Sequence, residues 1–151
     1  MKKKLSRGIG VFIVMIILTT SAFVLAFSPK RNLKPSEYNV GIIYDAAMRE
    51  KKPFVAMFFD DGCSFCHWFA PKFKVLSEIY AGKYNFVMIN LGDSATEEIV
   101  REYAIGSLPT IYIIDPSIDN RVLISNVLYG NLKRVRVELE RYLRIRAMIN
   151  K

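Results

Sequence analysis

The spacing of apolar positions changes several times along the chain, and each change marks a predicted element. The first apolar stretch is an uncharged run of 20 residues at 8–27. Residues 54–59 and 84–91 form shorter continuous apolar runs, as in strands covered on both faces. Two further strands are predicted at residues 110–114 and 122–127. The turn at residues 115–120 is short enough to join them as an antiparallel hairpin.

The segments before, between and after these strands have apolar residues at helical spacing. Helices are predicted at residues 40–52, 63–81, 95–104 and 132–148. Pro53 ends the first helix, because a proline disfavours the helical conformation of the residue before it. Asp93 or Ser94 can serve as the N-cap of the third. Read in order, these elements predict an α/β fold with a mixed central sheet flanked by helices on both faces.

The first apolar run is long enough to cross a bilayer as a helix, which takes about 20 residues. A positive cluster precedes it and marks the side that stays in the cytoplasm. We therefore expect a basic cytoplasmic tail at residues 1–7, one transmembrane anchor at 8–27, a linker at 28–37 and a single domain at 38–151. The domain is expected on the extracytoplasmic (periplasmic) side of the cytoplasmic membrane. The alternative is a cleaved signal peptide and secretion, although signal peptides have shorter apolar regions.

Composition and charge narrow the classes of partner. The chain has 151 residues, of which 52% are hydrophobic, enough for one packed domain. The net charge is +8, but four of the cations precede the apolar run. From Ser28 onward there are 18 basic and 14 acidic residues, a balance too mixed to indicate nucleic-acid binding.

The two cysteines, Cys63 and Cys66, carry the clearest chemical signal. With His67 as the only histidine, they are too few for a zinc site of four cysteines or of two cysteines and two histidines, and we expect no metal. Cys63 follows a predicted strand and opens a helix, where unpaired backbone N–H groups and the helix dipole favour a thiolate. Cys66 lies one turn further on and can reach the first sulfur. Such a pair can attack a substrate disulfide and resolve the mixed disulfide.

The residues around this pair resemble the thioredoxin family. The sequence CSFC after an apolar strand, with Pro71 five residues beyond Cys66, looks like the thioredoxin active-site helix. The segment YAIGSLPT at residues 103–110 resembles the thioredoxin segment that ends in a cis-proline followed by threonine. Gly130 resembles the glycine turn that enters the last helix. The similarity spans about residues 40–146 and implies a thioredoxin fold.

This resemblance also implies roles for individual residues. Cys63 would be the more exposed, attacking nucleophile and Cys66 the buried, resolving thiol. Pro109, in the uncommon cis form, would lie beside the sulfurs, and the backbone of Leu108 would pair with an extended substrate segment. The supporting positions of the motif are Ser64, Phe65, His67, Pro71, Thr110 and Gly130. No cofactor is implied beyond the redox-active cysteine pair.

The chain departs from the family pattern near the motif. Met57 stands where many thioredoxins have a buried acid six residues before the first cysteine. The tryptophan often found just before the motif is missing, and the single tryptophan, Trp68, follows it. Asp60 and Asp61 would oppose a thiolate by like-charge repulsion, whereas protonated His67 would favour it if its ring faced the sulfurs.

We expect thiol–disulfide exchange on exported proteins, and the resemblance favours a reductase that receives electrons from a membrane partner. A disulfide oxidase or isomerase of the same fold is the main alternative. Residues 63–67 also match the CxxCH signature of covalent haem attachment. A structural disulfide and a non-catalytic binding module remain open as well. The exposed face of the basic last helix is either solvated or in contact with anionic lipid headgroups.

Overall fold

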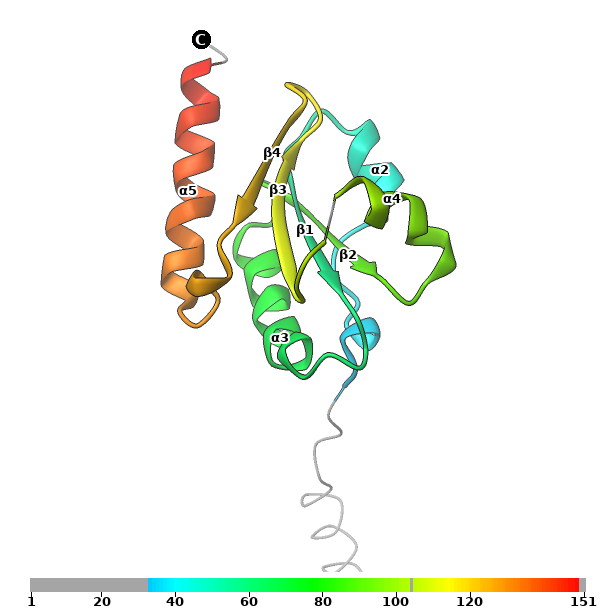
Figure 1. Ribbon diagram of the computed structural model, residues 1–151. Helices are drawn as coiled ribbons and strands as arrows, with labels where there is room; N and C mark the ends of the chain where they lie inside the picture. The colour runs from blue at the N-terminus through cyan, green and yellow to red at the C-terminus, as the bar shows by residue number, and fades with distance from the viewer. Residues whose placement is uncertain (1–32, 104, 150–151) are drawn as a thin grey trace, which may run out of the picture. The chain divides into compact units, whose positions relative to one another are not determined.

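The computed structural model describes residues 33–103 and 105–149, so the segment expected to be a membrane anchor lies outside the described residues. Within those two ranges, no helix has the length and apolar character needed to cross a membrane. In chain order, the elements are η1 (Pro35–Glu37), α2 (Tyr44–Arg49), β1 (Phe54–Phe59), α3 (Ser64–Ile79), β2 (Asn85–Asn90), η2 (Ser94–Thr96), α4 (Glu97–Glu102), β3 (Thr110–Asp115), β4 (Asn120–Ile124), η3 (Asn126–Leu128) and α5 (Leu132–Ile149), as Figure 1 shows.

The four strands form one mixed sheet in the order β2-β1-β3-β4. Strands β1 and β2 are parallel, whereas β1 with β3 and β3 with β4 are antiparallel. This arrangement confirms the mixed sheet predicted from the order of elements. It also confirms the antiparallel hairpin across residues 115–120.

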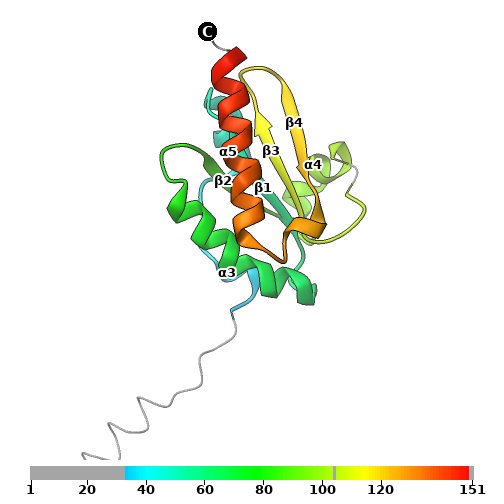
Figure 2. The ribbon, with the colours of Figure 1, turned by 90° about the vertical axis from the view of Figure 1, so that its left-hand side faces the viewer.

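Strand β1 lies in the centre of the sheet and is buried on both faces, which explains its continuous apolar sequence. Helices α3 and α5 cover one face of the sheet, and α2 and α4 cover the other (Figures 1 and 2). Alternate residues of β1 point to opposite faces. Those that pack with α3 and α5 are Val55, Met57 and Phe59, and those that pack with α2 and α4 are Phe54, Ala56 and Phe58.

The first predicted helix is wrong over its N-terminal part, since only Tyr44–Arg49 is helical. Gly41 adopts a φ of +72°, and the amide of Ile42 donates a hydrogen bond of 2.9 Å to the carbonyl of Phe86. A Cβ on Gly41 would lie 1.8 Å from that carbonyl oxygen. The backbone is therefore held against the residues of β2, a tertiary contact that local apolar spacing does not reveal.

The strand predicted at residues 122–127 ends at Ile124, because the hydroxyl of Tyr129 takes the next hydrogen bonds between β3 and β4. This hydroxyl accepts a hydrogen bond from the amide of Ile111 and donates one to the carbonyl of Ile124, both at 3.0 Å. Burial raises the pKa of Tyr129 to about 12. Residues 126 and 127, expected to continue the strand, belong to η3 instead.

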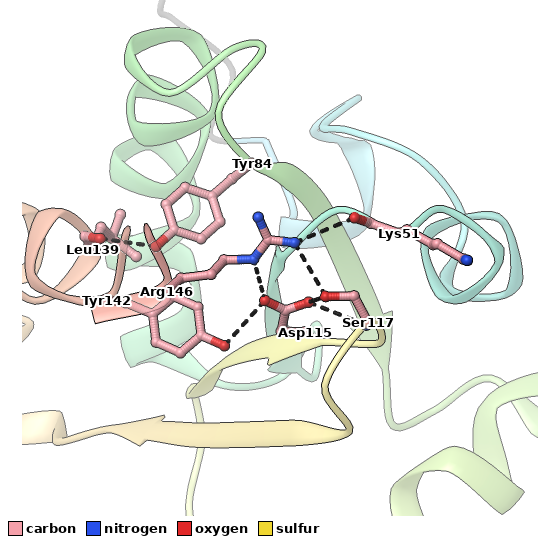
Figure 3. A network of polar contacts seen from close by, with 7 residues as sticks. All are labelled: Lys51, Tyr84, Asp115, Ser117, Leu139, Tyr142 and Arg146. Atoms are coloured by element: carbon pink, nitrogen blue, oxygen red, sulfur yellow. Dashed lines mark hydrogen bonds and ion pairs between the residues drawn. The ribbon is translucent and has the colours of Figure 1, made fainter. Parts of the chain in front are cut away.

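A buried ion pair at the hairpin end of the sheet fixes α5 in place (Figure 3). Asp115 is fully buried and pairs with Arg146 of α5. Its carboxylate also accepts hydrogen bonds from the Ser117 amide at 3.1 Å, the Ser117 hydroxyl at 2.6 Å and the Tyr142 hydroxyl at 3.4 Å. Burial alone would raise the pKa of Asp115, but the hydrogen bonds from Arg146 and Ser117 outweigh it and hold that pKa below its ordinary value.

Candidate active site

A tight turn leads from the end of β1 to Cys63. The amide of Gly62 donates to the Asp60 carboxylate at 2.6 Å, and the amide of Cys63 donates to the Asp60 carbonyl at 3.2 Å. Asp60 therefore organises the turn with both its side chain and its backbone. The turn delivers Cys63 as the N-cap of α3, which begins at Ser64. The helix predicted to open at this cysteine is confirmed.

Cys63 and Cys66 are joined in a disulfide, with their Cα atoms 5.2 Å apart. The sulfur of Cys63 also accepts a hydrogen bond of 3.1 Å from the backbone amide of Cys66. In the reduced pair this amide and the N-terminus of α3 would favour a thiolate at Cys63. Cys63 is half-buried, whereas Cys66 is 0% exposed. The predicted difference in exposure between the two cysteines is confirmed.

The peptide bond between Leu108 and Pro109 is cis, as predicted. Pro109 immediately precedes β3, whose first residue, Thr110, pairs with Phe58 near the end of β1. This register brings the cis-proline to the end of the sheet from which β1 leads to Cys63. The hydroxyl of Thr110 donates a hydrogen bond to the carbonyl of Ser107, which closes the loop around the proline.

A hollow of about 350 Å³ opens beside the cis-proline. Its walls come from the loop before β3, the end of β4 and η3, and they combine apolar and hydroxyl-bearing side chains. The lining residues are Gly106, Ser107, Pro109, Thr110, Tyr112, Leu123, Ile124, Ser125, Asn126 and Tyr129. The hollow thus borders Pro109, one of the two residues that the resemblance assigns to substrate binding.

Sequence reasoning missed one partner of the active-site turn, Ser36. Its amide and hydroxyl donate to the two carboxylate oxygens of Asp61 at 3.0 and 2.5 Å. Burial would raise the pKa of Asp61, but these hydrogen bonds lower it below its ordinary value. The Nε2 atom of His67 lies 2.7 Å from the Asp61 carbonyl. Ser36 belongs to η1, within the segment predicted as linker, and no local pattern signals a contact across 25 residues.

Two aromatic rings lie exposed on α3 directly after Cys63. Phe65 is 45% exposed and Trp68 is 40% exposed. Their rings are stacked with centroids 4.9 Å apart. The ammonium of Lys72 sits 3.2 Å from the centroid of the Trp68 ring, and burial lowers the pKa of Lys72. These side chains form an exposed apolar surface on the helix that Cys63 caps, with the tryptophan after the motif rather than before it.

Comparison with known proteins agrees with this geometry. The sequence profile of the family described as Thioredoxin matches residues 35–127, more than half of the chain. The chain belongs to the thioredoxin family. Thioredoxin-like protein HCF164, chloroplastic, from Arabidopsis thaliana is 31% identical over 72 residues, which are 48% of this chain and 28% of that protein. Its counterpart of the same name from Oryza sativa is 29% identical over 72 residues. The chain thus spans under a third of the length of these thioredoxin-like relatives.

Solved thioredoxin structures resemble the described domain as well. The reduced thioredoxin pre-protein of Schistosoma mansoni is 28% identical, with a TM-score of 0.50, and the match covers 62% of this chain and 81% of that one. The J-Trx1 fragment of ERdj5 is 22% identical, with a TM-score of 0.58, over 67% of this chain and 46% of that one. The second likeness shows the thioredoxin fold alone.

Within the thioredoxin fold, the position of the buried acid is occupied by an apolar side chain. Met57 is fully buried in the same core cluster as Cys66. A thioether neither gives nor accepts the proton of Cys66. Met57 therefore cannot take the role of the buried acid that many thioredoxins have at this position.

Pro71 and Gly130 are two further positions of the thioredoxin motif. Pro71 lies inside α3, as the resemblance implied. Gly130 lies in the turn before α5, but its φ is not positive and a Cβ there would meet nothing within 4 Å. The fold therefore places no steric demand for glycine at position 130.

Proposed function

We propose that this chain catalyses thiol–disulfide exchange through Cys63 and Cys66. The observation that carries the proposal is the position of Cys63. Its half-buried sulfur caps α3 and accepts a hydrogen bond from the Cys66 amide. The cis bond before Pro109 lies at the same end of the sheet, which supports a substrate site there.

The reaction proceeds in two exchanges at sulfur. The Cys63 thiolate attacks one sulfur of a substrate disulfide, forms a mixed disulfide and releases the other substrate sulfur as a thiolate that takes up a proton. Cys66 then loses its proton and attacks the Cys63 sulfur. The second substrate sulfur leaves, and the Cys63–Cys66 disulfide forms. Two electrons pass from the cysteine pair to the substrate.

An extended polypeptide segment is the proposed substrate. It would pair with the backbone of Leu108 beside Pro109, as an added strand does at a sheet edge. The hollow of about 350 Å³ next to the cis-proline offers room for a side chain of such a segment. The exposed rings of Phe65 and Trp68, on the helix that Cys63 caps, would offer this segment an apolar contact.

The proposal extends to the direction of exchange and to the location of the protein. We propose a reductase of exported proteins, held at the outer face of the cytoplasmic membrane by residues 8–27 and supplied with electrons by a membrane partner. The uncharged run at these residues supports the anchor. N-terminal sequencing of the mature protein tests it, because a new N-terminus near residue 23 or 29 would mean cleavage and secretion instead.

Insulin disulfide reduction with dithiothreitol as electron donor tests the chemistry. The wild-type chain is expected to accelerate reduction, and Cys63→Ser is expected to abolish the acceleration while keeping the circular dichroism spectrum. Unchanged activity in Cys63→Ser would refute the catalytic role. The reduction potential of the Cys63–Cys66 pair then decides the direction of exchange. A value of about −270 mV suits a reductant, and a value of about −120 mV suits an oxidant.

Haem attachment at residues 63–67 is the competing use of the same cysteines. The thioredoxin fold supports exchange, because Cys63 and Cys66 are joined to each other in a disulfide. The purified protein is expected to be colourless. A Soret band would overturn the exchange proposal in favour of haem.

A further inference from the structure

Helix α5 carries cations and aliphatic side chains together on its outward side. Its inner side is buried against the sheet and α3 through Val135, Leu139 and Tyr142. On the outer side, Val137 is 58% exposed and Met148 is 67% exposed. Figure 2 shows α5 in front of the sheet, so this outer side faces away from the sheet.

The outer side of α5 has a positive charge that its own carboxylates do not cancel. Its exposed cations are Lys133, Arg134, Arg136, Arg141 and Arg144. Glu138 pairs with Arg141, and Glu140 pairs with Lys83 of the turn between α3 and β2, both at 3.6 Å. Among the residues that the structure describes, the other four cations have no carboxylate within ion-pair distance.

Three of these cations surround a hollow of about 320 Å³ between α5 and the end of α3. Its walls are formed by Tyr80, Lys133, Arg136, Val137, Glu140 and Arg144. Guanidinium and ammonium groups bind phosphate through charge-assisted hydrogen bonds. The single carboxylate of the hollow, Glu140, is offset by Lys83. The hollow therefore has the charge and the donors to receive a phosphate group.

We propose that the outer face of α5 docks on an anionic lipid surface, with a headgroup phosphate in this hollow. Val137 and Met148 would enter the boundary between headgroups and acyl chains, as the apolar residues of interfacial helices do. The cations would meet the negative potential of the lipid surface. A nucleic acid would use the cations but would leave these two aliphatic side chains in water, so lipid fits the whole face better.

Quenching by brominated lipid tests the proposal on the full chain. In a Trp68→Phe background, Val137→Trp places a single tryptophan on the outer face of α5. Vesicles of phosphatidylcholine with about 30% phosphatidylglycerol, brominated on the acyl chains, are expected to lower its fluorescence about twofold. Pure phosphatidylcholine vesicles are expected to have little effect. About 0.5 M salt should reverse most of the quenching, because it screens the charges.

Two matched variants separate docking from an unspecific approach to the membrane. Met48→Trp in the same background places the probe on α2, across the sheet from α5, and is expected to escape quenching. Arg136→Gln with Arg144→Gln should weaken the quenching at position 137, whereas the same charge loss at Arg49 and Arg101, on α2 and α4, should not.

Several outcomes would overturn lipid docking, and none of them bears on thiol chemistry. These are no quenching at position 137, equal quenching at position 48, equal quenching by neutral vesicles, or quenching that survives the loss of both arginines. Retention on DNA without quenching would assign the face to another polyanion. Insulin reduction is measured without lipid, so the two proposals fail independently.

Discussion

Replacing Arg146 with methionine tests the ion pair that fixes α5 to the hairpin. Arg146→Met keeps a long side chain but removes the guanidinium that pairs with Asp115. The carboxylate of Asp115 is 0% exposed, so it cannot gain water in exchange. The same guanidinium donates to the carbonyl of Lys51 at 3.3 Å and to the hydroxyl of Ser117 at 3.1 Å. The change therefore removes the hydrogen bonds that Arg146 donates to Asp115, Lys51 and Ser117.

The expected loss of stability in Arg146→Met follows from the burial of Asp115 and Arg146. Removing one partner of a fully buried pair costs about 3–5 kcal/mol. Arg146 is 23% exposed, and Ser117 and Tyr142 still donate to Asp115, so the loss is smaller. We expect Arg146→Met to lower the free energy of unfolding by about 2–3 kcal/mol at pH 7. This corresponds to a fall in Tm of roughly 8–15 °C.

The loss of stability in Arg146→Met should also depend on pH and become smaller in acid. The pKa of Asp115 is lowered in the folded protein, because hydrogen bonds from Arg146 and Ser117 outweigh the effect of burial. A depressed carboxyl pKa contributes stability above the unfolded pKa of about 3.9, and this stability is lost as pH falls through the folded pKa. The difference between wild type and Arg146→Met should therefore be full at pH 6–7 and shrink below about pH 4.

Urea denaturation followed by circular dichroism measures both quantities. Arg144→Met serves as the control, since Arg144 is exposed on the same helix and should change stability by less than about 0.5 kcal/mol. A loss at Arg146 no larger than at Arg144 would refute the reasoning. So would a loss that remains constant from pH 7 to pH 3.

Three further changes test individual contacts. Tyr129→Phe removes the hydroxyl that joins β3 to β4 and should cost about 2 kcal/mol in urea denaturation. Gly41→Ala should cost about 3–4 kcal/mol because of its positive φ and its close approach to a carbonyl, whereas Gly130→Ala should stay within about 0.5 kcal/mol; equal losses would contradict this account. Ser36→Ala should raise the pKa of Asp61 toward its ordinary value in a carboxyl NMR titration, and an unchanged pKa would count against the contact.

Much of the fold follows from local pattern. The apolar run at residues 54–59 coincides with β1, because every one of its side chains is buried against one helical layer or the other. Asp93, predicted as one of two N-caps of the helix at 95–104, caps the short helix η2 that leads into α4 and accepts a hydrogen bond from the Ala95 amide at 3.0 Å. The position of Cys63 at a helix start also matches expectation. For these elements neighbouring residues contain the determining information, whereas the cis bond before Pro109 is an expectation of the family resemblance.

The features that the sequence did not predict depend on contacts between distant segments. Gly41 leaves the helical conformation because its backbone approaches Phe86. Ser36 meets Asp61 across 25 residues, and Arg146 meets Asp115 across 31. The local sequence around each of these polar residues is ordinary, so only the tertiary fold reveals its partner.

The most direct test of the central claim is to trap the mixed disulfide. Reduced Cys66→Ser is mixed with a peptide disulfide, and the products are mapped by mass spectrometry. A stable adduct on Cys63 is expected, whereas the wild-type chain should release the peptide thiol and form the Cys63–Cys66 disulfide. The absence of an adduct in Cys66→Ser, or equal peptide reduction by Cys63→Ser and wild type, would contradict the claim that Cys63 is the attacking nucleophile.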